Sequence, residues 1–273
     1  MKDIWEERHS IRFGDIDRSD RLTLGATFDY FQEAAISHAE NLGVGRESMA
    51  KTGQVWILSR ISVYLARRPK YGETVMVRSW PRSWEKLFAI RDYDIRDEAG
   101  EAAVRGRSGW LILDMEKRRP LRVQQIVEAL PPNGGVNAFS ALAPGLEERD
   151  NLGGAGERKA LYSDIDYNGH LNNTRYIQWI QDITDPEILE SAGGMRLDIN
   201  YLSEVKPGES VELRAGPILP AAGVSGEVSG AGVSGPAAGA ADYPGEIRAA
   251  LAYEGRRPGS GQPVFRAELR TGV

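Results

Sequence analysis

At 273 residues, with a formal net charge of −5 and an apolar fraction of 41%, the chain is long enough for two domains and has the composition of a globular protein. It contains no cysteine, which excludes disulfides and thiol nucleophiles, and its three histidines are too far apart in sequence to show metal-ligand spacing. Its net negative charge disfavours binding to nucleic acid. Without a nucleotide-binding motif, a signal-peptide core or an apolar run near the ~20 residues that span a bilayer, we expect a cytoplasmic protein with no membrane span and no cofactor.

The first half of the chain predicts one long helix followed by strands. Alternation over residues 8–16 indicates a strand, and Thr23 is placed to cap a helix over 24–42, which Gly43 ends. Strand-like runs separated by glycine and charged turns follow at 55–64, 74–80, 87–96 and 106–114. A helix followed by strands without interleaved helices favours an α+β fold, an antiparallel sheet with a helix on one face.

The second half repeats this order after a connection. Residues 131–158 are rich in Pro, Gly, Asn and charge, and we expect them to join an N-terminal unit, 1–130, to a C-terminal unit, 159–273. Within the C-terminal unit we expect a helix near 173–183 and strands at 195–202, 246–254 and 264–270. Residues 215–245 are almost all Gly, Ala, Ser, Pro and Val, which predicts a flexible insertion between two strands.

The stretch Leu161–Tyr176 concentrates chemistry-bearing side chains. Four of them fall within seven residues: Asp164, Asp166, Asn168 and His170. Asn172 or Asn173 is placed to cap the helix that follows, whose first backbone N–H groups lack intrahelical partners and can bind a carbonyl oxygen. An acid, an amide and an imidazole beside a helix start are the parts of an acyl-transfer or hydrolysis site.

A similar but less complete motif appears earlier in the chain. Arg12–Leu22 aligns with Leu161–Leu171, and Lys70–Arg78 then aligns with Lys206–Arg214. Two matches in one order predict an internal duplication of a long unit.

The two copies differ in their polar side chains. Ser19 and Arg21 stand where the second copy has Asn168 and His170. We therefore expect one active site, carried by the second half. Asp164 is expected to be structural, because the first copy repeats it as Asp15, and the same repetition at Asp17 leaves a partly turn-forming role open for Asp166.

The motif Asp166-Tyr-Asn-Gly-His-Leu-Asn-Asn173 resembles that of the acyl-acyl-carrier-protein thioesterases, the plant-type and bacterial fatty-acyl thioesterases of the hotdog superfamily. Supporting matches are Tyr176-Ile-x-Trp179, Trp56-Ile-Leu-Ser-Arg60 and Trp110-Leu-Ile-Leu-Asp114 followed by Arg118–Pro120. The resemblance implies a tandem double hotdog, with two long helices each wrapped by a curved antiparallel sheet. It also implies an acyl tunnel shaped mainly by the first unit.

Site residues follow from the resemblance by position. Asp166, Asn168 and His170 match the catalytic loop of the family, and Glu204 matches its acidic residue after the next strand. Val205 stands where the family has a cysteine, which removes a thiol route. The implied reaction is hydrolysis of fatty acyl-acyl-carrier-protein thioesters to free fatty acid, within fatty acid biosynthesis, with the carrier protein as partner.

The chemistry of these residues leaves the base open. Either His170 or Glu204 can take a proton from water, because the pKa of an imidazole lies near neutrality and desolvation raises the pKa of a carboxylate toward neutrality. We expect Glu204 to be buried beside His170. Asn168 would position water or substrate, and Asp166 would orient Asn168 or His170. Direct carboxylate attack to give an anhydride is the second route.

Three other functions remain open on the sequence. They are an acyl-coenzyme A thioesterase of the same fold, a hotdog enoyl hydratase and a non-catalytic acyl-binding module. Two basic runs, Arg67-Arg68 and Lys117-Arg118-Arg119, are candidate contacts for an acidic carrier protein. Acyl chain length, carrier and oligomeric state, including a homodimer, also stay open.

Overall fold

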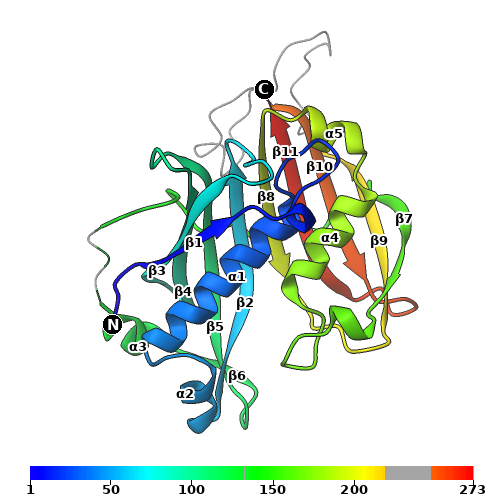
Figure 1. Ribbon diagram of the computed structural model, residues 1–273. Coiled ribbons are helices and arrows are strands. Elements are labelled where there is room, and N and C mark those ends of the chain that lie inside the picture. The colour runs from blue at the N-terminus through cyan, green and yellow to red at the C-terminus, as the bar shows by residue number, and fades with distance from the viewer. Residues whose placement is uncertain (132, 134, 219–246, 273) are drawn as a thin grey trace. The chain divides into compact units, whose positions relative to one another are not determined.

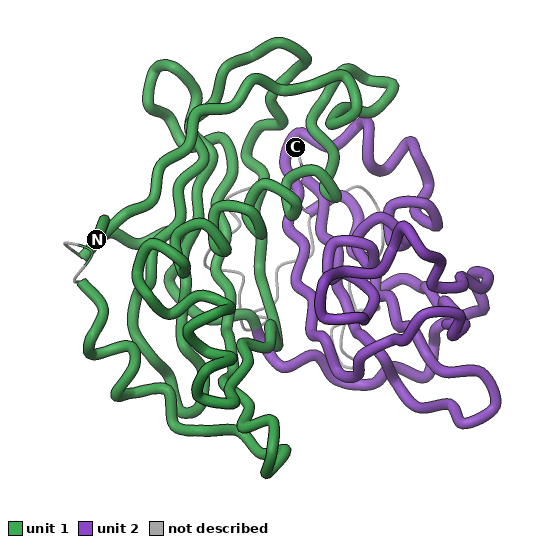
Figure 2. Tube along the Cα trace, turned by 60° about the horizontal axis from the view of Figure 1, so that its bottom comes forward, with its two compact units in different colours: residues 1–143 green, residues 144–273 purple. Residues whose placement is uncertain are grey.

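A computed structural model of the chain describes residues 1–131, 133, 135–218 and 247–272. The chain divides into two compact units, Met1–Ala143 and Pro144–Val273 (Figure 2). Each unit combines a helix with an antiparallel sheet, in agreement with the predicted α+β class (Figure 1). Among the helices of the described ranges, none has both the length and the apolar character of a membrane-crossing segment.

Unit 1 begins with a strand and its long helix and continues with the rest of its sheet. Its elements are β1 (Trp5–Ser10), η1 (Phe13–Asp15), α1 (Leu24–Asn41), α2 (Arg46–Lys51), β2 (Gln54–Leu65), β3 (Thr74–Glu85), β4 (Phe88–Arg96), β5 (Ala102–Asp114), β6 (Arg119–Leu121) and α3 (Gln124–Glu128). The strands pair antiparallel in the order β1-β3-β4-β5-β2, and β6 pairs with β5.

Unit 2 repeats this plan with a shorter main helix, 11 residues against 18. Its elements are β7 (Gly153–Lys159), η2 (Tyr162–Asp164), α4 (Asn173–Ile183), α5 (Pro186–Ser191), β8 (Gly194–Tyr201), β9 (Ser210–Pro217), β10 (Ile247–Arg256) and β11 (Pro263–Gly272). The antiparallel order is β8-β11-β10-β9-β7.

Three segments differ from the sequence-based expectation. The strand predicted over 8–16 ends at Ser10, because the Asp15 carboxylate accepts the backbone N–H of Arg12 and closes a 3₁₀ turn. Residues 153–158, expected in the connection, belong to the glycine-rich strand β7. This strand forms through backbone pairing with β9, although its sequence shows no hydrophobic alternation. Of the insertion predicted at 215–245, residues 215–217 belong to β9, and residues 219–245 lie outside the described ranges.

Helix α1 is capped and packed as its sequence predicts. The Thr23 side chain accepts the N–H of Ala26 at 3.1 Å, and Gly43 follows the helix with a φ of +71°. Phe31 of α1 is buried and stacks on Tyr93 of β4, with ring centroids 4.7 Å apart. Burying an aromatic side chain of this size against the sheet contributes on the order of 1.5–3 kcal/mol of stability.

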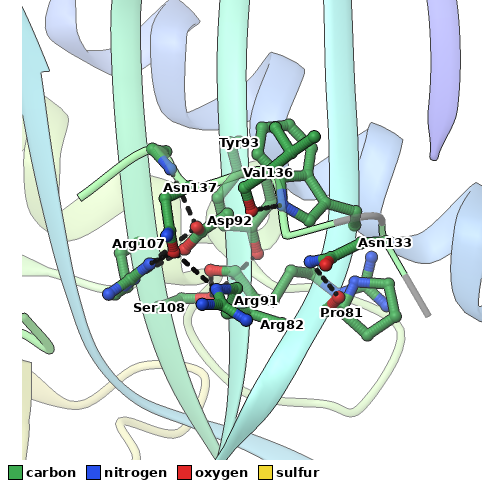
Figure 3. A network of polar contacts seen from close by, with 12 residues as sticks. Pro81, Arg82, Arg91, Asp92, Tyr93, Arg107, Ser108, Asn133, Val136 and Asn137 are labelled. Carbon is green, nitrogen blue, oxygen red and sulfur yellow. Dashed lines mark hydrogen bonds and ion pairs between the residues drawn. The ribbon is translucent and has the colours of Figure 1, made fainter. Parts of the chain in front are cut away.

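A buried ion pair holds the beginning of the connection on unit 1. Asp92 of β4 is fully buried and accepts Nε and Nη2 of Arg107 from β5 at 2.6 and 2.7 Å (Figure 3). The same carboxylate accepts the backbone N–H of Ala138 at 2.9 Å, and Arg107 also reaches the side chain of Asn137 at 3.2 Å. The carboxylate therefore has partners on both sides, which burial of a charge requires.

We expect Gly106→Ala to lower the free energy of unfolding by about 1–3 kcal/mol, the usual cost of overpacking. A Cβ at Gly106 would lie 2.7 Å from Cε2 of Phe31, whose ring is held against Tyr93. Gly14→Ala is the matched control, since its Cβ meets nothing within 4 Å. Chemical denaturation of both variants measures the difference, and equal stability would contradict the proposed packing.

Candidate active site

The two copies of the motif form loops with the same backbone hydrogen bonds. In the first loop, residues 15–23, Asp17 N donates to Arg21 O at 2.9 Å. In the second loop, residues 164–172, Asp166 N donates to His170 O at 2.9 Å. A single antiparallel bridge closes each loop, Ile16 with Leu22 and Ile165 with Leu171. The sequence match therefore corresponds to a repeated three-dimensional frame.

Each loop is also tied to the turn that follows its helix and next strand. Leu22 N donates to Pro69 O in unit 1, and Leu171 N donates to Val205 O in unit 2, both at 2.8 Å. These bonds make Arg68 and Glu204 equivalent positions, because each precedes the acceptor residue by one. The residue at that position lies beside the loop in both units.

In unit 2 this arrangement brings His170 and Glu204 together. Nε2 of His170 lies 3.2 Å from Oε2 of Glu204, the proximity expected from the sequence. The expected burial of the carboxylate is wrong, because the Glu204 side chain is 59% exposed while that of His170 is 29% exposed. Val205, the next residue, carries the buried side chain of the turn instead.

Asp166 orients Asn168. One carboxylate oxygen of Asp166 accepts the backbone N–H of Asn168 at 2.8 Å, and the other lies 3.5 Å from its Nδ2. The side-chain amide of Asn168 is thus held only by a long contact on an exposed residue, and it can donate to an incoming oxygen. Asp164 accepts the N–H of Leu161 at 2.9 Å, a turn-forming role repeated by Asp15 in unit 1.

The start of α4 has fewer free backbone N–H donors than the sequence suggested. Asn172 is the cap, and its side chain accepts the N–H of Thr174 at 2.9 Å. Its carbonyl oxygen accepts the N–H of Arg175 at 3.0 Å. Two backbone donors expected for a substrate oxygen are therefore already occupied, whereas the side-chain amide of Asn168 is an exposed donor in the second loop.

Tyr176, which the sequence showed only as part of the Tyr176-Ile-x-Trp179 match, forms the buried aromatic side of the site. Its ring packs edge-on against Tyr201 and Phe265 at 5.5 and 5.4 Å between centroids. Burial raises the pKa of the Tyr176 hydroxyl, and the Glu204 and Asp166 carboxylates raise it further against the opposing effect of Arg257. The phenol thus stays protonated beside the polar loop.

The first loop holds a closed ion pair where unit 2 has the His170–Glu204 contact. Arg68 lies 2.6 Å from Asp17, and only 5% of the Arg68 side chain is exposed. The carboxylate also accepts the hydroxyl of Ser19 at 2.6 Å. Burial alone raises the pKa of Asp17, but the hydrogen bonds from Ser19 and Arg68 outweigh it and hold the pKa below its ordinary value.

One of the two basic runs expected to contact a carrier protein is not free to do so. Arg68 is buried against Asp17, and Arg67 pairs with Glu73 at 2.7 Å. Lys117-Arg118-Arg119 is exposed at the turn between β5 and β6. Within the described ranges, no group of three or more His, Asp or Glu side chains is placed to hold a metal ion.

Comparison with known proteins assigns this fold and loop to one family. A family model described as Acyl-ACP thioesterase N-terminal domain matches residues 2–130, and one described as Acyl-ACP thioesterase C-terminal domain matches residues 154–226. The chloroplastic acyl-acyl-carrier-protein hydrolase FATB2 of Cuphea viscosissima is 26% identical over 219 residues, which cover 74% of this chain and 52% of that protein. The chain thus spans about half the length of the curated relatives it matches.

Solved structures agree on the fold. An acyl-ACP thioesterase from Bacteroides thetaiotaomicron VPI-5482 has a TM-score of 0.73 at 22% identity, covering 98% of this chain and 97% of that one. The 12:0-ACP thioesterase from Umbellularia californica also has a TM-score of 0.73 at 22% identity, covering 98% and 93% of the two chains. The architecture is therefore that of the hotdog-fold thioesterases. With both family models matched in order, the chain belongs to the acyl-ACP thioesterase family.

Gly169→Val is expected to destabilise the second loop by about 1–2 kcal/mol, whereas Gly169→Asn should be nearly neutral. Gly169 has a φ of +78°, and an added Cβ meets nothing within 4 Å, so backbone conformation alone decides the cost. Asp20 occupies the equivalent position of the first loop with a φ of +58°. Thermal and chemical unfolding distinguish the variants, and a valine variant as stable as the asparagine variant would refute backbone strain.

Proposed function

We propose that the protein hydrolyses fatty acyl-acyl-carrier-protein thioesters to free fatty acid and carrier protein. The contact that carries this function is the 3.2 Å approach of His170 to Glu204, in a loop that lies within the family match. The exposed amide of Asn168 beside it supplies a donor for the substrate carbonyl. Together they provide a proton acceptor and an oxyanion donor, the minimum that thioester hydrolysis by water requires.

His170 is the better base of the two candidates. The Glu204 side chain is 59% exposed to solvent, whereas that of His170 is only 29% exposed and belongs to the same loop as the Asn168 amide. An imidazole that donates its Nε2–H to Glu204 keeps Nδ1 unprotonated and able to accept a proton from water. We therefore assign His170 as general base and Glu204 as the group that selects its tautomer.

The reaction then follows from these positions. His170 removes a proton from water as the water oxygen attacks the thioester carbonyl carbon. The amide of Asn168, oriented by Asp166, donates to the carbonyl oxygen as negative charge develops on it. Collapse of the tetrahedral intermediate breaks the C–S bond, and His170 returns the proton to the leaving thiolate. The products are a fatty acid and the thiol of the carrier.

The finer fold assignment is part of the same proposal. We infer a tandem double hotdog with the units expected from the sequence, 1–130 and 159–273, the second extended to begin with β7 (Gly153–Lys159), so that residues 131–152 connect the two. The repeated hydrogen bonds of the two loops and the helix-plus-antiparallel-sheet content of both units support it. The catalytic residues belong to the C-terminal unit alone, because the first loop has no imidazole and its Asp17 is paired with Arg68.

A substrate panel tests the function directly. Purified protein is incubated with matched acyl-acyl-carrier-protein and acyl-coenzyme A thioesters of medium and long chains, and with an enoyl thioester. Free thiol and free fatty acid are both measured. We expect fatty acid release to be fastest from the carrier protein. Faster release from coenzyme A would assign the other carrier, and water addition to the enoyl substrate without thiol release would overturn the hydrolase assignment.

His170→Ala should lower kcat for the best substrate at least ~100-fold, the low end for loss of a general base, without unfolding the protein. Arg21→Ala, the equivalent change in the first loop, should leave kcat within about twofold, since that copy has no imidazole and has Arg68 at the position equivalent to Glu204. Steady-state kinetics with circular dichroism as a folding control provide the comparison. Similar losses in both variants would mean that the first copy takes part in catalysis.

A further inference from the structure

Arg257 lies directly after β10 and reaches across the turn that carries Glu204. Its Nη2 donates to Oγ of Ser203 at 3.2 Å and to the backbone carbonyl oxygen of Glu204. Its Nη1 pairs with Oε2 of Glu209 at 2.5 Å. One guanidinium therefore ties the beginning of the turn to its end, which its rigid fork of donors suits it to do.

The turn is held on its other side by the second loop. Val205 is fully buried, and its carbonyl oxygen accepts the N–H of Leu171. Oε2 of Glu209 also accepts the N–H of Lys206 at 2.9 Å. That bond, followed by the bond from Arg257, lowers the pKa of Glu209 and keeps it ionised as a partner for the guanidinium. Both faces of the backbone around Glu204 are thus fixed.

The side chain of Glu204 depends on this support. Because it is mostly exposed, packing does not lock its rotamer, and its position relative to His170 is set by where its backbone lies. A contact to its carbonyl oxygen therefore acts on the distance between carboxylate and imidazole. Displacement by about 1 Å is enough to cost up to roughly 100-fold in rate.

Unit 1 contains a comparable clamp without a site. Arg67 pairs with Glu73 at 2.7 Å and with Asp97, in the β4–β5 hairpin, at 3.3 Å. Glu73 is equivalent to Glu209, but the residue equivalent to Glu204 is Arg68, which is buried against Asp17. Arg67 thus serves as a matched control for the structural effect of breaking such a clamp.

We propose that Arg257 is a positioning residue that fixes the backbone of Glu204 so that its carboxylate meets His170. This role rests on the proposed thioesterase function and extends it to a residue on the neighbouring hairpin. Arg257 acts through Glu204 and does not itself contact the substrate.

Arg257→Gln should lower kcat about tenfold, within the range that small misplacement causes, with KM nearly unchanged. In a Glu204→Gln background the same change should cost almost nothing more, because residues that act through one group are non-additive. Arg257→Gln should also lower the melting temperature. Arg67→Gln should lower the melting temperature by a similar amount but leave kcat unaltered. Arg257→Lys keeps the charge pair with Glu209 but cannot bridge both ends of the turn, so it should restore stability more than kcat.

The outcomes separate the two proposals. A wild-type protein that hydrolyses no thioester of the panel contradicts the thioesterase function itself. An active wild type with normal kcat in Arg257→Gln, or with a loss that adds in full to that of Glu204→Gln, overturns the positioning role alone. If the glutamine variant does not fold, Arg257→Lys with and without Glu204→Gln provides the same test.

Discussion

One backbone hydrogen bond, from Leu171 N to Val205 O, determines the arrangement on which the whole site depends. His170 and Glu204 are the residues immediately before its donor and its acceptor, so closing the bond places their side chains next to each other. Leu171 and Val205 are themselves buried, which shields the bond from water. A neutral hydrogen bond contributes only about 1 kcal/mol to stability, yet this one brings two residues that are distant in the sequence within 3.2 Å of each other.

The same bond exists in unit 1, between Leu22 and Pro69, but it organises different chemistry. There it brings Arg68 to Asp17, and the two charges neutralise each other in a nearly buried pair. In unit 2 the equivalent position carries an exposed acid facing an imidazole. The two units therefore share a backbone frame, and the side chains placed on it distinguish them.

Local features of the sequence were the ones that could be predicted. The helix start at Thr23, the cap at Asn172 and the loop residues through His170 are encoded within a few positions, where turn and capping preferences act. The approach of Glu204 to His170 was expected from the family resemblance, in which Glu204 matches the acidic residue after the next strand. Its exposure did not, because burial depends on residues from other strands.

Contacts between distant segments escaped prediction for the same reason. Arg257 is 53 residues from Glu204 in sequence, and nothing in its own neighbourhood marks it as different from other surface arginines. Strand β7 has no hydrophobic period, since its pairing with β9 involves the backbone alone. The helix start also lost its expected role through local geometry, as Asn172 occupies the N–H groups of Thr174 and Arg175.

The Arg68–Asp17 pair restricts how the chain can evolve. Replacing Arg68 by an acid would place a second carboxylate beside Asp17 in a largely buried position, and removing Asp17 would take away the carboxylate that pairs with the buried guanidinium. The replacement of Arg68 by an acid, one of the steps toward a second imidazole–acid contact, therefore passes through a destabilised intermediate, although the backbone frame for that contact is already present. The two units therefore keep different side chains at these positions unless the loop and the turn change together, through coupled substitutions.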